Sequence, residues 1–236
     1  MNCLVLCIIF ICLGAISVTF FLLEKIRSYS VKAVLIKSIA SLFFIAVSAI
    51  GLYKNGYHIL TLFVTLGLFL GLLGDIWLDL KYVFREHDLE FSYAGFIAFG
   101  IGHILYISGM FLEFYHGQNV LYIILPLVIG TAAGFGNIFL DKMMKLNYGK
   151  MKIASGVYGA TLFSMVLTTL SLSIMTKFQN TTLVMFFIAA ILFAASDLIL
   201  SGTYFGEGKE RPVDIITNIV TYYSAQFMIA FSLFFL

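Results

Sequence analysis

Long apolar segments recur along the whole chain, and they constrain its fold more than any other feature of the sequence. Each holds about 20 residues, enough to cross a hydrocarbon layer of roughly 30 Å as an α-helix. Lipid offers backbone amides no hydrogen-bond partners, so such segments must be helical. We therefore expect membrane spans at residues 3–23, 33–53, 58–80, 93–115, 119–140, 153–175, 181–202 and 214–236.

The composition supports the same fold class. Of 236 residues, 61% are hydrophobic and only 11% are charged, whereas a soluble domain carries about 25% charged residues. The sequence predicts an all-α, polytopic membrane protein in which residues 1–236 form a single domain of eight transmembrane helices. The net charge of +2 is small and the basic residues are dispersed, which argues against nucleic-acid binding. The oligomeric state is not indicated.

The basic residues of the loops predict an orientation. The loops after the first, third, fifth and seventh spans hold eleven lysines and arginines, and the other loops hold two. Cytoplasmic loops of membrane proteins carry the excess of positive charge. We expect the odd-numbered loops to face the cytoplasm and both termini to lie on the opposite side.

Polar side chains inside the spans gather in the half that this orientation places near the cytoplasm. Asp75 and Asp197 lie near the inner ends of the third and seventh spans, and Lys37 lies one turn into the second. An ionisable group within the membrane costs at least a few kcal/mol, so it normally faces the bundle interior. We expect a polar chamber open toward the cytoplasm, with further members Tyr158, Asn218, Tyr222, Tyr223 and Gln226, and with His103 and Tyr106 at mid-depth.

Small residues beside these polar groups predict close helix packing. Gly67, Gly71 and Gly74 form a stripe on the third span, next to the face shared by Asp75 and Asp79. The fourth span has several glycines of its own. Such stripes let helix backbones approach one another within a membrane.

Several of these residues have simpler interpretations. Asp79 is close to Lys81 and could lie among the lipid headgroups, and Lys37 could either pair with Asp75 or extend to the interface. His103 could have a purely structural role, as a hydrogen-bonding residue between helices. A zinc site is disfavoured because it needs several grouped ligands, which leaves His103 with two aspartates as the set that could form one. Ser196 beside Asp197 lacks the strained turn of a serine hydrolase.

Four segments, in order, resemble the YhhN-like family, whose best-understood members are lysoplasmalogenases. They are "GLLGDIWLDL", "YAGFIAFGIGHILYISGMF", "ILFAASDLILSGTYF" and "TNIVTYYSAQFMIAF". The resemblance implies a membrane hydrolase that cleaves the vinyl ether bond of lysoplasmalogens. Its products would be a fatty aldehyde and a glycerophospho-alcohol, either glycerophosphoethanolamine or glycerophosphocholine.

The resemblance also implies a set of site residues. The matching positions are Gly74-Asp75, Ser196-Asp197, His103, Tyr106, Tyr158, Tyr222, Tyr223, Ala225, Gln226 and Lys37. The lysine is often followed by proline in the family, and Ser38 stands there instead.

Vinyl ether hydrolysis fits two carboxyl groups. Protonation of the outer vinyl carbon gives an oxocarbenium ion, to which water adds, so the site needs a proton donor, a negative charge and a base. Burial and a neighbouring like charge favour the protonated form of a carboxyl group, so two acids can divide these duties. We expect Asp75 and Asp197 to be that pair, with neither role assigned.

The remaining candidates have supporting roles in this scheme. His103 could relay a proton, while Tyr106, Tyr158, Tyr222 and Gln226 could position water and the headgroup. Lys37 suits the phosphate of a lysophospholipid, and no step requires a metal or an organic cofactor. Two alternatives share the same residues: a proton-coupled transporter and a non-catalytic lipid-binding protein.

Overall fold

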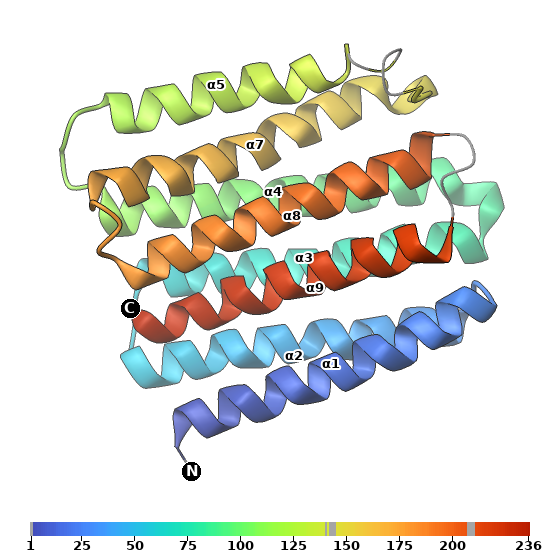
Figure 1. Ribbon diagram of the computed structural model, residues 1–236, viewed down its shortest axis with the longest axis horizontal. Helices are drawn as coiled ribbons and strands as arrows, with labels where there is room; N and C mark the ends of the chain where they lie inside the picture. Colours follow the sequence, from blue (N-terminus) through green and yellow to red (C-terminus); the bar gives the residue numbers. More distant parts are fainter. Residues whose placement is uncertain (1, 140, 142–144, 207–210) are drawn as a thin grey trace.

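The computed structural model describes residues 2–139, 141, 145–206 and 211–236 as a bundle of α-helices (Figure 1). Within these residues, the β pairing is a single bridge between Leu146 and Gly206. The predicted all-α bundle of eight helices is confirmed. The helices are α1 (Cys3–Arg27), α2 (Val31–Asn55), α3 (Ile59–Val83), α4 (Asp88–Phe114), α5 (Leu121–Asn137), α7 (Lys152–Met175), α8 (Thr181–Phe205) and α9 (Pro212–Ser232).

Seven of the described helices are long and apolar enough to cross a membrane, which makes the chain an integral, multi-pass membrane protein. The exception is α5, whose 17 residues fall short of the expected span 119–140. Residue 140, the last of that span, lies outside the described residues. Two of the loop lysines that were counted to predict the orientation, Lys142 and Lys209, also lie outside them. The side of the membrane on which each terminus lies stays a prediction.

Short polar residues and one proline mark where several helices begin. The Ser30 side chain accepts a hydrogen bond from the Ala33 amide at 3.2 Å at the start of α2. The Asn180 side chain does the same for the Leu183 amide at 3.0 Å at the start of α8. Such caps satisfy amides that have no partner within the helix. Pro212 opens α9, a position where its missing N–H costs nothing.

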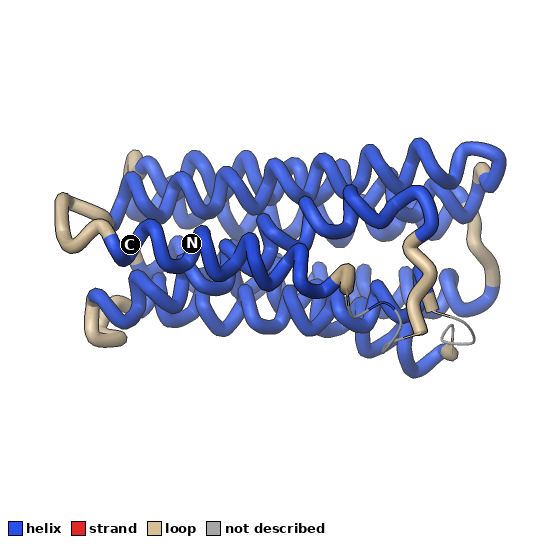
Figure 2. Tube along the Cα trace, turned by 90° about the horizontal axis from the view of Figure 1, so that it is seen from above, coloured by secondary structure: helices blue, strands red, loops and turns tan. Residues whose placement is uncertain are grey.

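The helices run nearly side by side, and the loops gather at the two ends of the bundle (Figure 2). The two chain ends lie at the same end, with α1 at one edge of the bundle and α5 at the other (Figure 1). Extensive packing joins α1 with α2, α3 with α4, α5 with α7, and α8 with α9. Large side chains from the central helices fill the core, among them Phe44, Leu68, Met165, Phe186, Phe193 and Ile229.

The glycines of α3 and α4 allow the close approach that their spacing predicted. A Cβ atom added to Gly67 would lie 2.3 Å from Cε1 of Tyr106. One added to Gly102 would lie 3.2 Å from the carbonyl oxygen of Gly67. These contacts hold α3 and α4 close together in the bundle interior.

Candidate active site

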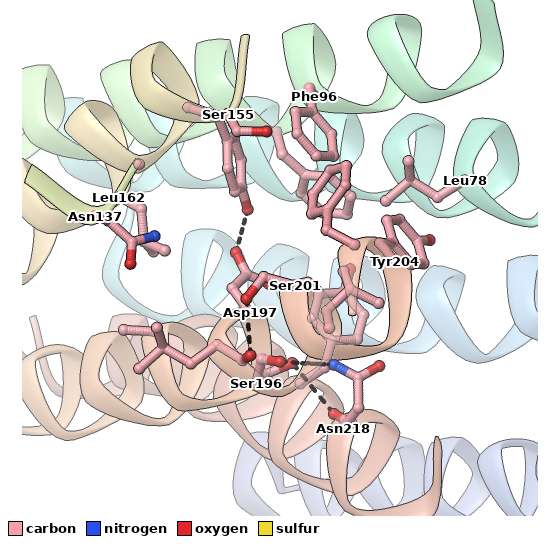
Figure 3. A pocket seen from close by; sticks show the side chains of 18 of the residues that line it. Leu78, Phe96, Asn137, Ser155, Leu162, Ser196, Asp197, Ser201, Tyr204 and Asn218 are labelled. Carbon is pink, nitrogen blue, oxygen red and sulfur yellow. Dashed lines mark hydrogen bonds between the residues drawn. The ribbon is translucent and has the colours of Figure 1, made fainter. Parts of the chain in front are cut away.

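A cavity of about 90 Å³ lies in the half of the bundle where α3 and α8 end and α2, α7 and α9 begin. It has room for more than a single water molecule. Figure 3 shows Asp197 within it, between Ser155 and Ser196, with Asn137 and Tyr204 on opposite sides. Seven of the residues predicted from the sequence line this cavity: Lys37, Asp75, Tyr158, Ser196, Asp197, Asn218 and Tyr222.

Asp75 is a buried carboxylate with three polar partners from two other helices. Lys37 Nζ, from α2, lies 3.1 Å from its Oδ1. The hydroxyl groups of Ser41 and Tyr222 donate hydrogen bonds to its Oδ2 at 2.6 and 2.8 Å. A cation and two hydroxyl donors all stabilise negative charge on this carboxyl group.

Lys37 belongs to a longer chain of buried charges. Besides Asp75, its Nζ lies 2.9 Å from Oδ2 of Asp79, whose Oδ1 lies 2.7 Å from Nζ of Lys25. The order Lys25, Asp79, Lys37, Asp75 alternates in sign and ties α1, α2 and α3 together. Lys37 therefore pairs within the bundle and does not extend to the interface. Asp79 is also buried within the bundle, where it pairs with two lysines and does not project outward.

Asp197 has different surroundings. The Tyr158 hydroxyl donates a hydrogen bond to its Oδ2, and no lysine, arginine or histidine of the described residues forms an ion pair with it. The side chain is partly exposed and lines the cavity. The two carboxyl groups on this cavity therefore differ in the positive charge beside them.

Ser196 connects α8 to α9. The side-chain amide of Asn218 donates hydrogen bonds to the backbone carbonyl oxygen of Ser196 at 2.8 Å and to the Ser196 Oγ at 2.9 Å. Its hydroxyl in turn donates to the Asn218 carbonyl oxygen at 3.2 Å. These contacts occupy the hydroxyl that a nucleophilic serine would need free, and they suit a structural role.

Tyr223 and Gln226 lie behind Asp75 and do not line the cavity. The Tyr223 hydroxyl lies 3.0 Å from Ser41 Oγ and donates to the Lys37 carbonyl oxygen at 3.2 Å. The Gln226 amide donates to the Tyr222 hydroxyl at 3.0 Å. Both therefore support partners of Asp75, which makes them suited to positioning that carboxylate.

His103 and Tyr106 also lie outside the cavity lining, buried among aromatic rings. The His103 ring centroid lies 5.4 Å from that of Tyr158 and 5.0 Å from that of Phe193. Its Nδ1 is 3.5 Å from Oγ1 of Thr161, a long contact. His103 thus packs against the partner of Asp197 without reaching the carboxyl group through a described hydrogen bond.

Other residues of the site, on the cavity wall or in contact with Asp75, were not singled out from the sequence. Ser41 had a usable signal, because it follows Lys37 by four residues and so shares its helix face. Lys25 looked like a loop residue, but α1 extends to Arg27 and carries it into the bundle. Tyr204 lines the cavity near the end of α8.

Tyr148 was missed because it lies in the connection before α7. Its ring is buried, and its hydroxyl has no hydrogen-bond partner among the described residues although the side chain lines the cavity. Burial raises the pKa of this phenol, and the Asp141 carboxylate adds to the shift. The hydroxyl therefore stays protonated and is available as a donor inside the cavity.

Metal ligands are not grouped in the described part of the chain, where no three His, Cys, Asp or Glu side chains come together. The cavity offers two lysines, two aspartates and several hydroxyl groups. This set can transfer protons and stabilise charge through its own side chains.

Comparison with known proteins adds the family. The sequence matches the YhhN family over residues 31–233, a range that contains α2 to α9 and leaves α1 outside. No curated protein and no solved structure matches the chain. The matched range holds both cavity aspartates and covers most of the chain, and the family is associated with hydrolase activity. The chain is therefore an integral membrane protein that belongs to the YhhN family.

Proposed function

We propose that this protein hydrolyses the vinyl ether bond of lysoplasmalogens, releasing a fatty aldehyde and a glycerophospho-alcohol. The observation that carries the proposal is that Asp75 and Asp197 line the same cavity, with a cation beside only one of them. Two carboxyl groups in unlike surroundings can divide the duties of acid and base. Membership of a family associated with hydrolase activity supports the same conclusion.

The surroundings suggest which carboxyl group does what. Asp197 is the proton donor in this proposal, since no described cation stabilises its negative charge. It transfers a proton to the outer vinyl carbon, and the electron pair of the double bond forms the new C–H bond. The positive charge that develops on the ether carbon and oxygen is stabilised by the carboxylate of Asp75. Lys37 and two hydroxyl donors hold that carboxylate in place.

Water completes the reaction. It attacks the oxocarbenium carbon and gives a proton to Asp197, which restores the acid for the next turnover. The hemiacetal then breaks its bond to the glycerol oxygen, which takes the hydroxyl proton as the aldehyde leaves. Tyr158 and Tyr222 stand beside the two carboxyl groups and could orient the water. General acid–base catalysis of this kind contributes about 10²–10⁴-fold.

The apolar part of the lining suits the hydrocarbon chain of such a lipid. Phe96 and Phe99 from α4 and Leu162 and Phe163 from α7 form part of the cavity wall. Figure 3 shows Phe96 and Leu162 on different sides of Asp197. An alkenyl chain could leave the cavity between helices, where the surrounding lipid is equally apolar.

The test is an assay of aldehyde release from a lysoplasmalogen by the purified protein in detergent. We expect turnover by the wild type and by Asp214→Asn, a matched change in an acid outside the cavity lining. The double variant Asp75→Asn/Asp197→Asn should release no aldehyde above background while still binding lysolipid. Substrate uptake by vesicles without aldehyde formation would instead favour a transporter, and binding without turnover by the wild type would favour a lipid-binding protein.

A further inference from the structure

A second hollow, of about 340 Å³, lies beside the cavity at the same end of the bundle. Tyr204 lines both. We call it the end hollow, and its lining comes from the ends of α3 and α8, the connection from α3 to α4, the start of α4 and the connection after α1. These residues are Tyr29, Lys81, Tyr82, Arg85, Asp88, Thr203 and Tyr204.

Lys81 is the unusual member of this lining. Its side chain is only 11% exposed, yet its acidic partner Asp88 lies 3.5 Å away and is 60% exposed. Its Nζ lies 3.5 Å from the ring centroid of Tyr204 and 5.1 Å from that of Tyr82. Cation–π contacts hold the ammonium group at the wall of the hollow, while the long, solvated contact with Asp88 neutralises its charge only weakly.

Lys37 contrasts with Lys81. Its ammonium group already lies between two buried carboxylates, at 3.1 Å from Asp75 and 2.9 Å from Asp79. An anionic ligand that bound to Lys37 would have to displace one of them. Lys81 has no comparable competitor, and the exposed Arg85 adds a second cation to the same hollow.

We propose that the end hollow binds the phosphate group of the lysophospholipid, with Lys81 and Arg85 as its cationic ligands. This inference rests on the proposed function. Lys81 follows Asp75 by six residues on α3, which places it roughly 9 Å further along the helix axis. The glycerol and ether atoms between a lysoplasmalogen's phosphate and its double bond must bridge such a gap. Tyr204 lines both the cavity and the end hollow, so it marks the point where the two adjoin.

Binding of two ether lipids tests the proposal without requiring turnover. One probe is a 1-O-alkyl lysophosphatidylethanolamine, which lacks the reactive double bond, and the other is the corresponding 1-O-alkylglycerol, which lacks the phosphate. Lys81→Met should weaken binding of the phospholipid about tenfold, as expected for loss of a charge-assisted contact, and leave the alkylglycerol unchanged. Arg85→Gln should act in the same direction, and because Arg85 is exposed this variant should fold even if Lys81→Met does not.

Lys54 provides the matched control. Its Nζ also lies over an aromatic ring, 4.1 Å from the centroid of Phe234, but near the other end of the bundle. Lys54→Met should change the affinity for neither probe. Equal losses for both probes in Lys81→Met and Arg85→Gln, or no loss for the phospholipid in either, would overturn the proposal.

A third probe separates a lipid headgroup from free phosphate. Inorganic phosphate should bind far more weakly than the alkyl lysophospholipid, because the tail supplies much of the affinity. Equal affinity for inorganic phosphate would assign the end hollow to a free anion and overturn the headgroup assignment. Aldehyde release by the wild type tests the hydrolase proposal separately, so the two can fail independently.

Discussion

Asp75 and Asp197 lie on the wall of one cavity, but only Asp75 has a cation beside it. Lys37 and two hydroxyl donors surround the first carboxyl group, whereas the Tyr158 hydroxyl is the described hydrogen-bond partner of the second. The two residues should therefore differ in what they contribute to the stability of the fold, even if both are needed for the reaction.

Substitution of each aspartate alone tests this difference. Asp75→Asn and Asp197→Asn should each lower kcat for aldehyde release by about 10²–10⁴-fold. Asp75→Asn should also lower the free energy of unfolding by roughly 1–3 kcal/mol, because it removes the charge partner of buried groups. Asp197→Asn should be nearly neutral in stability, since an asparagine oxygen can accept the same hydrogen bond from Tyr158. Thermal unfolding of both variants in detergent, measured together with their activity, tests this difference. Equal losses of stability in the two variants would contradict it.

The charge chain from Lys25 to Asp75 gives a second prediction. Lys37→Met leaves Asp75 without a cation and Asp79 with Lys25 alone, which should cost roughly 3–5 kcal/mol of stability. Adding Asp75→Asn removes the unpaired charge, so the double variant should be more stable than the sum of the single changes predicts, by about 0.5–3 kcal/mol. Chemical denaturation in detergent measures the free energy of unfolding of the wild type, the two single variants and the double variant. The exposed Lys177→Met serves as the neutral control. Strict additivity would mean that the two side chains do not interact.

The sequence was sufficient to predict the helices because lipid leaves the chain little choice. Apolar stretches of about 20 residues had to be helical, and the observed helices differ from the expected spans mainly at their ends. The α5 helix is the clearest difference, since it ends at Asn137. Depth along the spans also sufficed to place Asp75 and Asp197 at one level, and both line the same cavity.

Other parts of the site depend on packing that no local pattern records. The sequence could not indicate whether Lys37 extends to the interface or pairs inward. It pairs inward because Asp75 and Asp79 approach it from α3. His103 shares a helix face with Tyr106, but spacing could not indicate that aromatic rings would separate it from the cavity. Tyr148 lies in a connection between helices, so its entry into the lining depends on how that segment folds back.

Orientation in the membrane is a third prediction. The distribution of lysine and arginine among the loops predicts that both termini lie outside the cytoplasm. A reporter fused after Leu236 that is active only outside the cytoplasm should therefore be active, and one that works only inside should be silent. The reverse result would place the cavity and the end hollow toward the other face of the membrane. A reporter inserted after Gly56, in the loop between α2 and α3, should give the same result as the terminal fusion, because that loop lies at the same end of the bundle (Figure 1).

Tyr148 tests whether the cavity binds substrate. Its buried hydroxyl has no described hydrogen-bond partner, so removing it in Tyr148→Phe should leave stability unchanged or slightly raised. If substrate or the attacking water accepts a hydrogen bond from this group, kcat/KM should fall about five- to tenfold. Tyr53→Phe, in a strongly exposed tyrosine, is the control and should have no effect. Unchanged kinetics in Tyr148→Phe would show that this hydroxyl does not contact the reacting lipid.

Packing of α5 against α7 depends on Gly134, and a neighbouring glycine provides an internal control. A Cβ atom added to Gly134 would lie 2.1 Å from the backbone nitrogen of Ala160, whereas one added to Gly136 would meet nothing within 4 Å. Gly134→Val should therefore force the two helices apart at a cost of about 1–3 kcal/mol, and Gly136→Val should be tolerated. Both variants place the same residue in the same helix, so intrinsic helix preference cancels in the comparison.

The same displacement should reach the cavity, because α5 carries Asn137 and α7 carries Tyr158 on its wall. We expect Gly134→Val to lower both the unfolding temperature and the rate of aldehyde release, while Gly136→Val changes neither by more than the error of the assay. Equal unfolding temperatures for the two variants would show that α5 and α7 do not pack backbone to backbone at Gly134. Loss of stability without loss of activity would show that the position of α5 does not control the cavity.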